Sequence, residues 1–444
     1  MTDASRRLLF LLALVIAVAS ADAAPRRRAV APGTGSPEAQ WLRERAIPLD
    51  TVDPTIPADE LRPLLDQLEG VEVITLGEGT HYTHEFQAVY HRLSRFLAEE
   101  RGVRVFTFEW GWPEAFAIDE YVRTGVGDLE ELLRDDVWKF WDTEEVRDLV
   151  LWARAWNESR PENDHIRLLG VDPWVVSRPK SHVTNYLLGV DPAAGTAAQS
   201  SLACLDSSFS EYSKRPAAAQ QSCREAISGV ANAMAANRSA YEAKSSARQF
   251  AAAARSAAMI LQAEYIATGL TATDWEERRD EMAAANVLAL RKELNASTVV
   301  FRGHNGHASA AGYWTGANLN ASVGAYLREQ LGGRLYAIAT TSSRGTYHAH
   351  ATAGGVSSFG VHPFPQPRSE SWEVKLDAVG YPQMIVSFRP VAPEWTMAER
   401  PFFIYVGNLR FADATRYSPP TSLPQAFDAV IYVRDTTPSR LLAP

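Results

Sequence analysis

Acidic and imidazole side chains follow a short apolar run near the start of the chain, in an arrangement that could move protons. The run VEVITL is followed by Gly77-Glu78-Gly79-Thr80-His81, so that a carboxylate and an imidazole lie three residues apart on a glycine-rich turn. Imidazole has an unperturbed pKa of about 6.5, so it can both accept and return a proton near neutral pH. The pair is therefore a candidate for general acid–base catalysis.

Three further apolar runs end in the same way. VRVFTF precedes Glu109, IRLLGV precedes Asp172, and TVVF precedes Arg302-Gly303-His304-Asn305-Gly306-His307. Polar residues that cluster at one end of each β-branched run are typical of a site at the carboxyl edge of an α/β sheet. Acids and imidazoles gathered there could hydrolyse a bond by activating water, without a covalent intermediate.

Other chemistries are disfavoured by what the motifs lack. No GxSxG nucleophile elbow occurs, because residues 355–360 (GVSSFG) have the wrong spacing. No cysteine lies beside a candidate histidine, and the GEGTH turn lacks both the dinucleotide fingerprint and the phosphate-loop lysine. We expect no cofactor. A divalent metal stays open as an alternative, since Glu78, His81, Glu109, His304 and His307 offer nitrogen and oxygen ligands for zinc or manganese. His81 would then be a ligand and not the base.

The elements that position these residues can be read from the apolar periodicity. Strands are expected at residues 71–76, 103–108, 166–171 and 298–301, with helices between them that include one ending before Gly102 and one over 143–157. A strand, a helix and a second strand in that order form a right-handed parallel unit. We predict an α/β fold with a mixed, mostly parallel central sheet flanked by helices.

The middle of the chain changes composition. From about 175 to 295 it is rich in alanine, serine and glutamine, which predicts an inserted helical cap whose last helix covers 275–294. Cys204 and Cys223 are the two cysteines. In an exported chain we expect them to pair, and a short loop of this kind stabilises by roughly 3 kcal/mol; two separate buried thiols are the alternative.

The final third is predicted to return to the sheet and not to form a separate module. A helix is expected over 323–331, with strands over 335–341, 383–388, 402–406 and 428–433. Earlier in the chain, a first helix is expected within 40–70, where Asp59 precedes ELRPLLDQL.

The amino terminus has the pattern of a secretory signal. Arg6 and Arg7 precede an apolar run over 8–19 and a small-residue cleavage pattern at 21–23, which predicts a signal peptide over 1–23, a linker over 24–39 and one domain over 40–444. We therefore expect a periplasmic or secreted protein. No later segment is long and apolar enough to span a bilayer.

Composition limits the partners. Hydrophobic residues make up 46% of the chain and charged residues 22%, which is typical of a globular protein. A net charge of −9 argues against nucleic acid or an anionic membrane as the main partner. A small-molecule substrate is expected, and the oligomeric state is left open. Of the many aromatic residues, Trp110, Trp112 and Trp174 follow strand ends, and we expect them to line an apolar pocket.

Six blocks, in this order, are similar to the erythromycin esterase family: LGEGTHYTHEF, VFTFEWGW, FWDTEEVRDLVLWARAWN, LLGVDPW, RRDEMAAANVLAL and FRGHNGHA. The closing FDAVIYVRDTTPSRLL also resembles the end of that family. The resemblance covers about residue 40 to the carboxyl terminus. It implies an α/β core with a helical cap, a site at the strand ends and, for some members, hydrolysis of the macrolactone ester of erythromycin-type antibiotics.

Roles follow from this resemblance position by position. His81 matches the proposed general base, Glu78 and Glu109 match the acids that orient it, and His304 and His307 match a second pair that could stabilise an oxyanion or protonate the leaving alkoxide. Asp172 is expected beside the substrate. The chain departs from the family nine residues after the base.

At that position esterase members often carry a basic residue, and this chain has Tyr90, with Arg92 two positions on. We expect both to lie near the substrate. A non-catalytic protein that binds a hydrophobic or metal-containing ligand in the same cleft is the alternative function.

Overall fold

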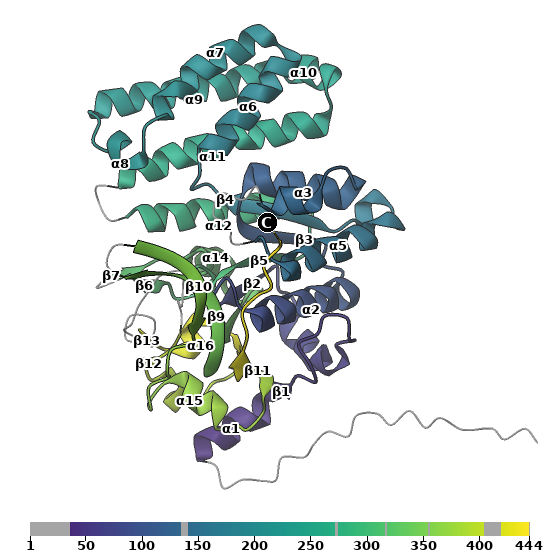
Figure 1. Ribbon diagram of the computed structural model, residues 1–444, viewed down its shortest axis with the longest axis vertical. Coiled ribbons are helices and arrows are strands. Elements are labelled where there is room, and N and C mark those ends of the chain that lie inside the picture. The colour runs from purple at the N-terminus through teal and green to yellow at the C-terminus, as the bar shows by residue number, and fades with distance from the viewer. Residues whose placement is uncertain are drawn as a thin grey trace, which may run out of the picture. The chain divides into compact units, whose positions relative to one another are not determined.

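An eight-stranded sheet forms the centre of the fold (Figure 1). The structure, a computed structural model, describes residues 36–134, 141–270, 274–315, 318–353, 356–403 and 419–443. Across the sheet the strands are β1 (Ala46–Pro48), β11 (Gln383–Ser387), β14 (Ala429–Val433), β8 (Leu335–Thr341), β2 (Val73–Glu78), β5 (Val299–His304), β3 (Val105–Gly111) and β4 (Arg167–Asp172). β1 pairs antiparallel with β11 and β11 with β14, and every other neighbouring pair is parallel. The prediction of a mixed, mostly parallel α/β sheet is confirmed.

Both faces of the sheet are covered, so its strands are buried on two sides. Alternate residues of one strand enter different hydrophobic clusters: Val300 packs with residues of α2 (His84–Arg101) and α5 (Glu144–Glu158), whereas Val299 and Phe301 pack with residues of α12 (Trp275–Glu293) and α14 (Val323–Leu331). This alternation is the two-residue period of a β-strand. The two faces are called the α2 face and the α12 face below.

The helix ends have simple causes in the sequence. α2 stops at Gly102, whose φ of 67° is the left-handed conformation that glycine adopts without strain. α5 begins after Thr143, whose hydroxyl accepts a hydrogen bond from the backbone N–H of Val146. Both helices agree with the expected boundaries. In contrast, residues Asp59–Leu68 form a 3₁₀ helix, η1, with Pro63 inside it. Pro63 lacks the backbone N–H that an α-helix would use there.

Helices occupy the alanine-rich middle of the chain, as expected. They are α6 (Ser177–Val190), α7 (Pro192–Leu202), α8 (Phe209–Tyr212), α9 (Ala217–Ala236), α10 (Arg238–Lys244) and α11 (Ala247–Gly269). These helices share a hydrophobic cluster of their own, and α11 contacts α3 (Trp112–Thr124) and α12 next to the sheet (Figure 1). None of the described helices is long and apolar enough to cross a membrane.

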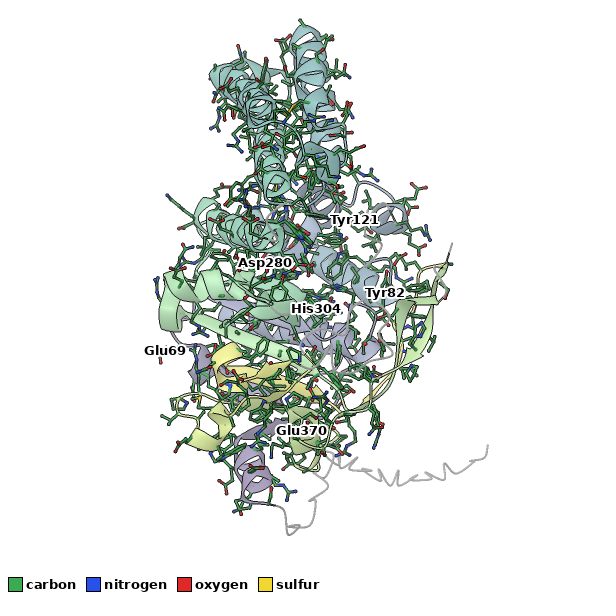
Figure 2. The ribbon with its side chains drawn as sticks, turned by 90° about the vertical axis from the view of Figure 1, so that its left-hand side faces the viewer. Glu69, Tyr82, Tyr121, Asp280, His304 and Glu370 are labelled. Atoms are coloured by element: carbon green, nitrogen blue, oxygen red, sulfur yellow. A yellow bond between two sulfur atoms is a disulfide. The ribbon has the colours of Figure 1, made fainter. Side chains whose placement is uncertain are left out.

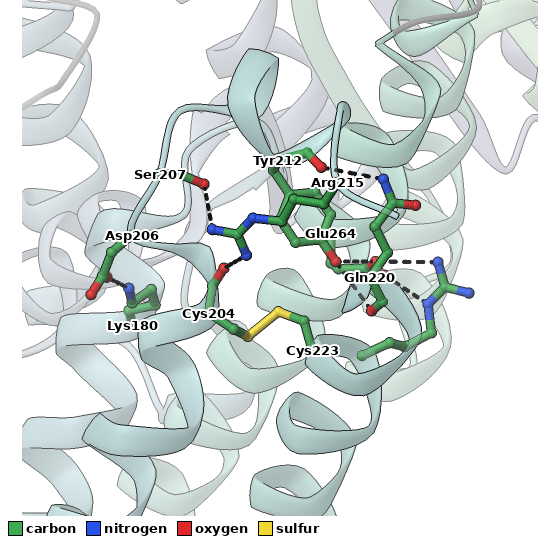
Figure 3. The surroundings of a disulfide bond; sticks show 10 residues. Lys180, Cys204, Asp206, Ser207, Tyr212, Arg215, Gln220, Cys223 and Glu264 are labelled. Atoms are coloured by element: carbon green, nitrogen blue, oxygen red, sulfur yellow. Dashed lines mark hydrogen bonds and ion pairs between the residues drawn. A yellow bond between two sulfur atoms is a disulfide. The ribbon is translucent and has the colours of Figure 1, made fainter. Parts of the chain in front are cut away.

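Cys204 and Cys223 form a disulfide within this helical cap (Figure 3). It joins the 3₁₀ turn η3 (Ala203–Leu205) to α9, and the two sulfur atoms close a loop with a sequence separation of 19. The pairing expected for an exported chain is therefore present. Beside it, Glu264 accepts hydrogen bonds from Tyr212 and Arg224.

Breaking this disulfide should destabilise the cap. We expect the double variant Cys204→Ser/Cys223→Ser to lose about 3 kcal/mol in the free energy of unfolding, because the open chain gains loop entropy on unfolding. Denaturant unfolding followed by circular dichroism measures the loss. Reduction of the wild-type protein with dithiothreitol should give the same decrease and have no effect on the double variant. Equal unfolding curves for the two proteins would contradict the expectation.

The carboxyl-terminal third differs from expectation in two places. A hairpin of β9 (Arg344–Ala353) and β10 (Val356–Pro363), joined by β15 (Asp435–Thr436), forms a separate three-stranded sheet that the sequence analysis did not predict. Its strands are rich in glycine, alanine and histidine, which give a weak β signal. The strand expected over 402–406 is wrong in its described part: Phe402 and Phe403 lie outside any strand, after β12 (Arg400–Pro401), and the rest falls outside the described residues.

The remaining elements connect these parts. They are α1 (Pro37–Arg45), α4 (Leu129–Arg134), η2 (Glu162–Asp164), α13 (Asn305–Ala308), β6 (Tyr313–Thr315), β7 (Asn318–Asn320), η4 (Gly332–Arg334), α15 (Trp372–Asp377), η5 (Glu394–Met397), β13 (Pro420–Thr421) and α16 (Leu423–Ala426). α1 begins inside the segment expected as a linker over 24–39. The signal peptide expected over 1–23 lies outside the described residues.

Candidate active site

Four neighbouring strands bring the expected acids and imidazoles to one edge of the sheet. Glu78 is the last residue of β2 and pairs in register with His304, the last residue of β5. Glu109 lies near the end of β3, and Asp172 ends β4. Because these strands are parallel and adjacent, their carboxyl ends meet at the same edge. In the view of Figure 2, His304 lies between Asp280 and Tyr82.

The turn after β2 holds His81 against Glu78. The Nδ1 atom of His81 lies 2.6 Å from Oε1 of Glu78, and Gln87 donates to Oε2 of Glu78 at 3.1 Å and to the His81 carbonyl at 2.7 Å. When Nδ1–H donates to the carboxylate, the lone pair of the imidazole lies on Nε2. Glu78 thus selects the tautomer of His81 that a general base requires.

Close packing explains the glycine next to the end of β2. A Cβ at Gly77 would lie 2.4 Å from Oδ1 of Asn305, which follows β5. Asn305 in turn donates to the carbonyl of Thr340 at 2.8 Å and accepts from the Thr340 backbone N–H at 3.1 Å. The glycine therefore allows the ends of β2, β5 and β8 to approach closely, which brings the Glu78 and His304 strand ends together.

The imidazole of His304 meets that of His81. Their ring centroids lie 5.1 Å apart with the planes at 75°. The Nδ1 atom of His304 accepts a hydrogen bond from the backbone N–H of Gly306, which puts the ring proton on Nε2. The backbone N–H of His304 donates to Oε2 of Glu109 at 3.0 Å. The two histidines therefore present complementary tautomers, one with an accepting Nε2 and one with a donating Nε2–H.

A second cluster of charges lies on the α12 face. Arg279 donates to Glu109 at 2.9 Å and to Asp172 at 2.6 and 3.0 Å. His307 lies between two carboxylates, with Nδ1 2.7 Å from Asp280 and Nε2 3.2 Å from Glu109. Arg279 and Asp280 are adjacent on α12, so this helix closes the cluster from outside the sheet. Glu109 belongs to both groups, because its other oxygen accepts from the His304 backbone.

The paired charges outweigh burial at His307 and Glu109, whereas burial outweighs them at Asp280 and raises the pKa of that carboxyl. Burial lowers the pKa of His307, but the charges of Asp280 and Glu109 and its hydrogen bonds to both outweigh burial and raise the pKa to about 10. Burial also raises the pKa of Glu109, and the charges of His307 and Arg279 outweigh that effect and hold the pKa well below its usual range. His307 is therefore a cation at neutral pH with both nitrogens engaged. This arrangement does not fit the expected role of His307 as a donor to an oxyanion or leaving group.

The raised pKa of His307 predicts a pH dependence of stability. A histidine whose folded-state pKa lies above its unfolded value near 6.5 contributes its full stabilisation below pH 6.5 and loses it as the pH rises toward about 10. We expect wild type to exceed His307→Gln in the free energy of unfolding at pH 6, and this difference to shrink by on the order of 5 kcal/mol by pH 10, at about 1.4 kcal/mol per pKa unit. Denaturant unfolding at several pH values measures it. A difference that stays constant would contradict the assignment.

Two residues at the site were missed in the sequence: Arg279 of α12, described above, and Arg302. Arg302, on β5, donates to Oε2 of Glu78 at 2.8 Å and also to Oε1 of Gln87. Its guanidinium lies over the rings of Tyr90, 4.1 Å away, and Trp141, 4.8 Å away. The one signal that could have found it is an arginine inside the apolar run TVVFRGH. Tyr90 is therefore buried beside the cation that binds Glu78.

Several residues expected to bind substrate have other places. Trp110 is 1% exposed in the core, and Trp112 is buried and donates to the carbonyl of Ala252. Arg92 is buried apart from the site, where it binds Glu60 and the carbonyls of Ile56 and Pro57. These three positions correct the expectation of substrate contacts, since Trp110 and Trp112 pack in the core and Arg92, on α2, is engaged by Glu60.

The other two lie closer to the edge of the sheet. Trp174 is half-buried, with its ring 4.5 Å from that of Trp275 and 5.2 Å from that of Phe209. Asp172 is held by Arg279 and accepts from the backbone N–H of Trp174 at 3.0 Å. The ring of Trp174 thus remains a candidate for substrate contact on the cap side of the site. Asp172 instead holds α12, through Arg279, and the backbone at Trp174.

The donor atoms that a metal would need are shared with cations. Glu78 is bound by Arg302, and Glu109 and Asp172 by Arg279. Within the described ranges, no group of three or more His, Cys, Asp or Glu side chains is arranged to hold a metal ion. The residues therefore fit a proton-transfer site better than the ligand set considered in the sequence analysis.

Access to the site is narrow. The side chain of His81 is 6% exposed, and His304 is fully buried. A cavity of about 10 Å³ borders Glu78 and Arg302, is lined by Tyr90, Leu93 and Ile338, and has room for about one water molecule. Of the two imidazoles, that of His81 is therefore the one with solvent-exposed surface.

Comparisons with known proteins agree with this fold. A family model described as erythromycin esterase matches residues 98–436, a range that includes Glu109, His304 and His307 and begins after His81. The chain is 32% identical over 133 residues to erythromycin esterase type II of Escherichia coli, a match that covers 30% of this chain and 31% of that protein. The match thus spans about a third of that relative.

Solved structures extend the likeness over the whole fold. A protein from Bacillus cereus superposes with a TM-score of 0.78 at 22% identity, covering 91% of this chain and 98% of that one. A mutant erythromycin esterase in its open conformation superposes with a TM-score of 0.68 at 18% identity, covering 90% and 99%. At these identities the likeness shows the fold.

Proposed function

The chain belongs to the erythromycin esterase family, and on that premise we propose that it is a hydrolase that cleaves a carboxylic ester of a bulky, mostly apolar small molecule, such as a macrolactone. The observation that carries the proposal is the pair of facing imidazoles, with ring centroids 5.1 Å apart and one of them held by Glu78. An ester and a water molecule placed at this pair would meet a base and a hydrogen-bond donor together.

His81 is the base in this mechanism. Its Nε2 takes a proton from water while its Nδ1–H keeps donating a hydrogen bond to Glu78. The resulting hydroxide adds to the ester carbonyl carbon. The carboxylate of Glu78 stabilises the imidazolium that forms, as a buried acid does beside a catalytic histidine. Gln87 fixes both partners, because its amide donates to Glu78 and to the His81 carbonyl.

His304 stabilises the oxyanion. Its Nε2–H donates a hydrogen bond to the oxyanion of the tetrahedral intermediate and keeps its proton throughout. The imidazolium of His81 then gives its proton to the departing alkoxide, so the intermediate collapses to a carboxylic acid and an alcohol and His81 becomes neutral again. Glu109 holds His304 in place through the backbone N–H. The cluster of Arg279, His307 and Asp280 holds Glu109 in turn.

We also propose that the protein acts outside the cytoplasm. The support is the signal-like sequence over 1–23 and the disulfide between Cys204 and Cys223, a bond that persists in oxidising compartments. Fractionation of cells that express the full chain, with immunodetection of the mature form, tests this. Retention of the full-length chain in the cytoplasm would contradict it.

The activity is tested with purified mature protein. Macrolides and generic aryl and alkyl esters are incubated with it, and mass spectrometry looks for the mass gain of one water or for the separated acid and alcohol. The same reactions are run after dialysis against EDTA. We expect at least one bulky apolar ester to be cleaved with and without EDTA. Turnover that disappears with the chelator and returns with zinc or manganese would favour the metal-dependent alternative, and no turnover on any ester would favour a binding protein.

A further inference from the structure

Arg302 has an unusual environment for an arginine. It is 1% exposed, in β5, where its register partners are the apolar residues Leu76 and Phe108. Moving a guanidinium from water into such a place costs several kcal/mol unless a carboxylate compensates its charge. The carboxylate that compensates it is Glu78, at 2.8 Å. The sheet thus contains a buried cation whose ion-pair partner is the acid that orients His81.

The two oxygens of Glu78 are divided between two nitrogen bases. Oε1 accepts from His81 and Oε2 from Arg302. Arginine keeps its proton at every physiological pH, whereas imidazole does not. Because Arg302 already balances the charge of Glu78, the carboxylate does not need a protonated His81 as a counter-ion. An ionised Glu78 without Arg302 would favour the protonated imidazole, and a protonated imidazole cannot act as a base.

We propose that Arg302 is a positioning residue that balances the charge of Glu78 and thereby keeps His81 a neutral imidazole able to accept a proton from water. The inference rests on the proposed function, because it assigns a role within that site. The aromatic rings of Tyr90 and Trp141 hold the guanidinium in place from two sides, and Gln87 links it to the same carboxylate.

The other charged or titratable groups around His81 do not take over this role. His304 faces it from the end of β5, and Glu109 faces it from β3. The charge of Glu109 is already shared between Arg279 and His307. Removal of Arg302 therefore leaves Glu78 without the arginine that balances its charge, directly beside His81.

The expected result is a shift of the acid limb of the pH profile. In Arg302→Met the pKa that governs the acid limb of kcat/KM should rise by about one to two pH units, as for a group whose neighbouring charge changes. At pH values below the wild-type pKa the variant should be about 10- to 100-fold slower than wild type, and it should recover most of the difference above the shifted pKa. Arg302→Lys keeps the charge, so its limb should stay within about half a unit of wild type.

Arg92→Met is the matched control. Arg92 is also buried, on α2, and also pairs with a buried glutamate, Glu60. Its replacement should lower the free energy of unfolding about as much as Arg302→Met does. It should leave the acid limb of the kcat/KM profile at the wild-type pH. The proposal is overturned if Arg302→Met is slower by the same factor at every pH, because that outcome assigns Arg302 a purely structural role.

A titration that needs no substrate separates this proposal from the proposed function. The pKa of His81 is measured by NMR with ¹⁵N-labelled histidine in two variants, Glu78→Gln and Glu78→Gln/Arg302→Met. The double variant has lost both buried charges, so it is expected to fold even if Arg302→Met alone does not. If Arg302 acts through its charge, His81 should titrate about one unit lower in the single variant, where the cation is uncompensated. Equal pKa values in the two proteins overturn the proposal. If wild type cleaves no ester, this titration still decides the role of Arg302.

Discussion

Replacement of His81 by alanine should reduce kcat/KM by about 10²- to 10⁴-fold, which is the usual contribution of a positioned general base. The imidazole is held by Glu78 at 2.6 Å, and its ring centroid lies 5.1 Å from that of His304. Binding of the intact ester should change by less than about threefold, because the rest of the site remains. Steady-state kinetics and calorimetry with the same ester measure the two effects.

His84 provides the matched control for this variant. It lies three residues further on and also holds a glutamate, with Nδ1 2.6 Å from Glu145, but its side chain is 27% exposed at the start of α2. His84→Ala should keep kcat/KM within about threefold of wild type. Equal losses in the two variants would mean that the loop, and not the base, is responsible. Unchanged turnover in His81→Ala would remove His81 from the mechanism.

Replacement of Arg279 by methionine should strongly lower the free energy of unfolding. The variant leaves Glu109, Asp172 and Asp280 around a single cation, His307, and removing one partner from a buried charge pair typically costs about 3–5 kcal/mol. Because these residues join α12 to β3 and β4, the loss should be seen as a lower free energy of unfolding of the whole sheet. Denaturant unfolding at pH 7 gives the value.

A surface arginine shows how much of that cost comes from burial. Arg62 also binds a glutamate, Glu100, at 2.7 Å, but its side chain is 55% exposed. Arg62→Met should cost about 0–1 kcal/mol, as exposed pairs do. Adding Asp172→Asn to Arg279→Met should recover part of the stability, because one unpaired carboxylate is removed. If Arg279→Met costs no more than Arg62→Met, the cluster on the α12 face contributes little to the fold.

The order of elements and most of their ends could be predicted from the sequence because local signals define them. Apolar β-branched runs mark β2, β3, β4 and β5, and caps such as Gly102 and Thr143 mark helix ends. The placement of Glu78, Glu109 and His304 at one edge of the sheet could also be predicted, because the carboxyl ends of parallel strands lie at the same edge. These predictions use only residues close together in the chain.

Pairings between distant residues could not be predicted. Arg302 and Glu78 are separated by 224 positions, and their contact depends on β5 lying next to β2, an order that no local pattern specifies. The same holds for Arg279, which reaches Glu109 from a helix 170 positions away. Trp110 and Trp112 were expected to line a pocket because they follow strand ends, but an aromatic side chain fits a core equally well. Only the packed structure distinguishes these uses.

The central claim is that water, activated by His81, attacks the ester directly. The most direct measurement is a single turnover in H₂¹⁸O, with wild-type enzyme in excess over an ester that it cleaves. The masses of the product and of the protein are measured by mass spectrometry at successive quench times. The account predicts a carboxylic acid that carries one ¹⁸O and a protein whose mass never changes. A protein adduct with the mass of the acyl group, or ¹⁸O incorporated into Glu78, would contradict it.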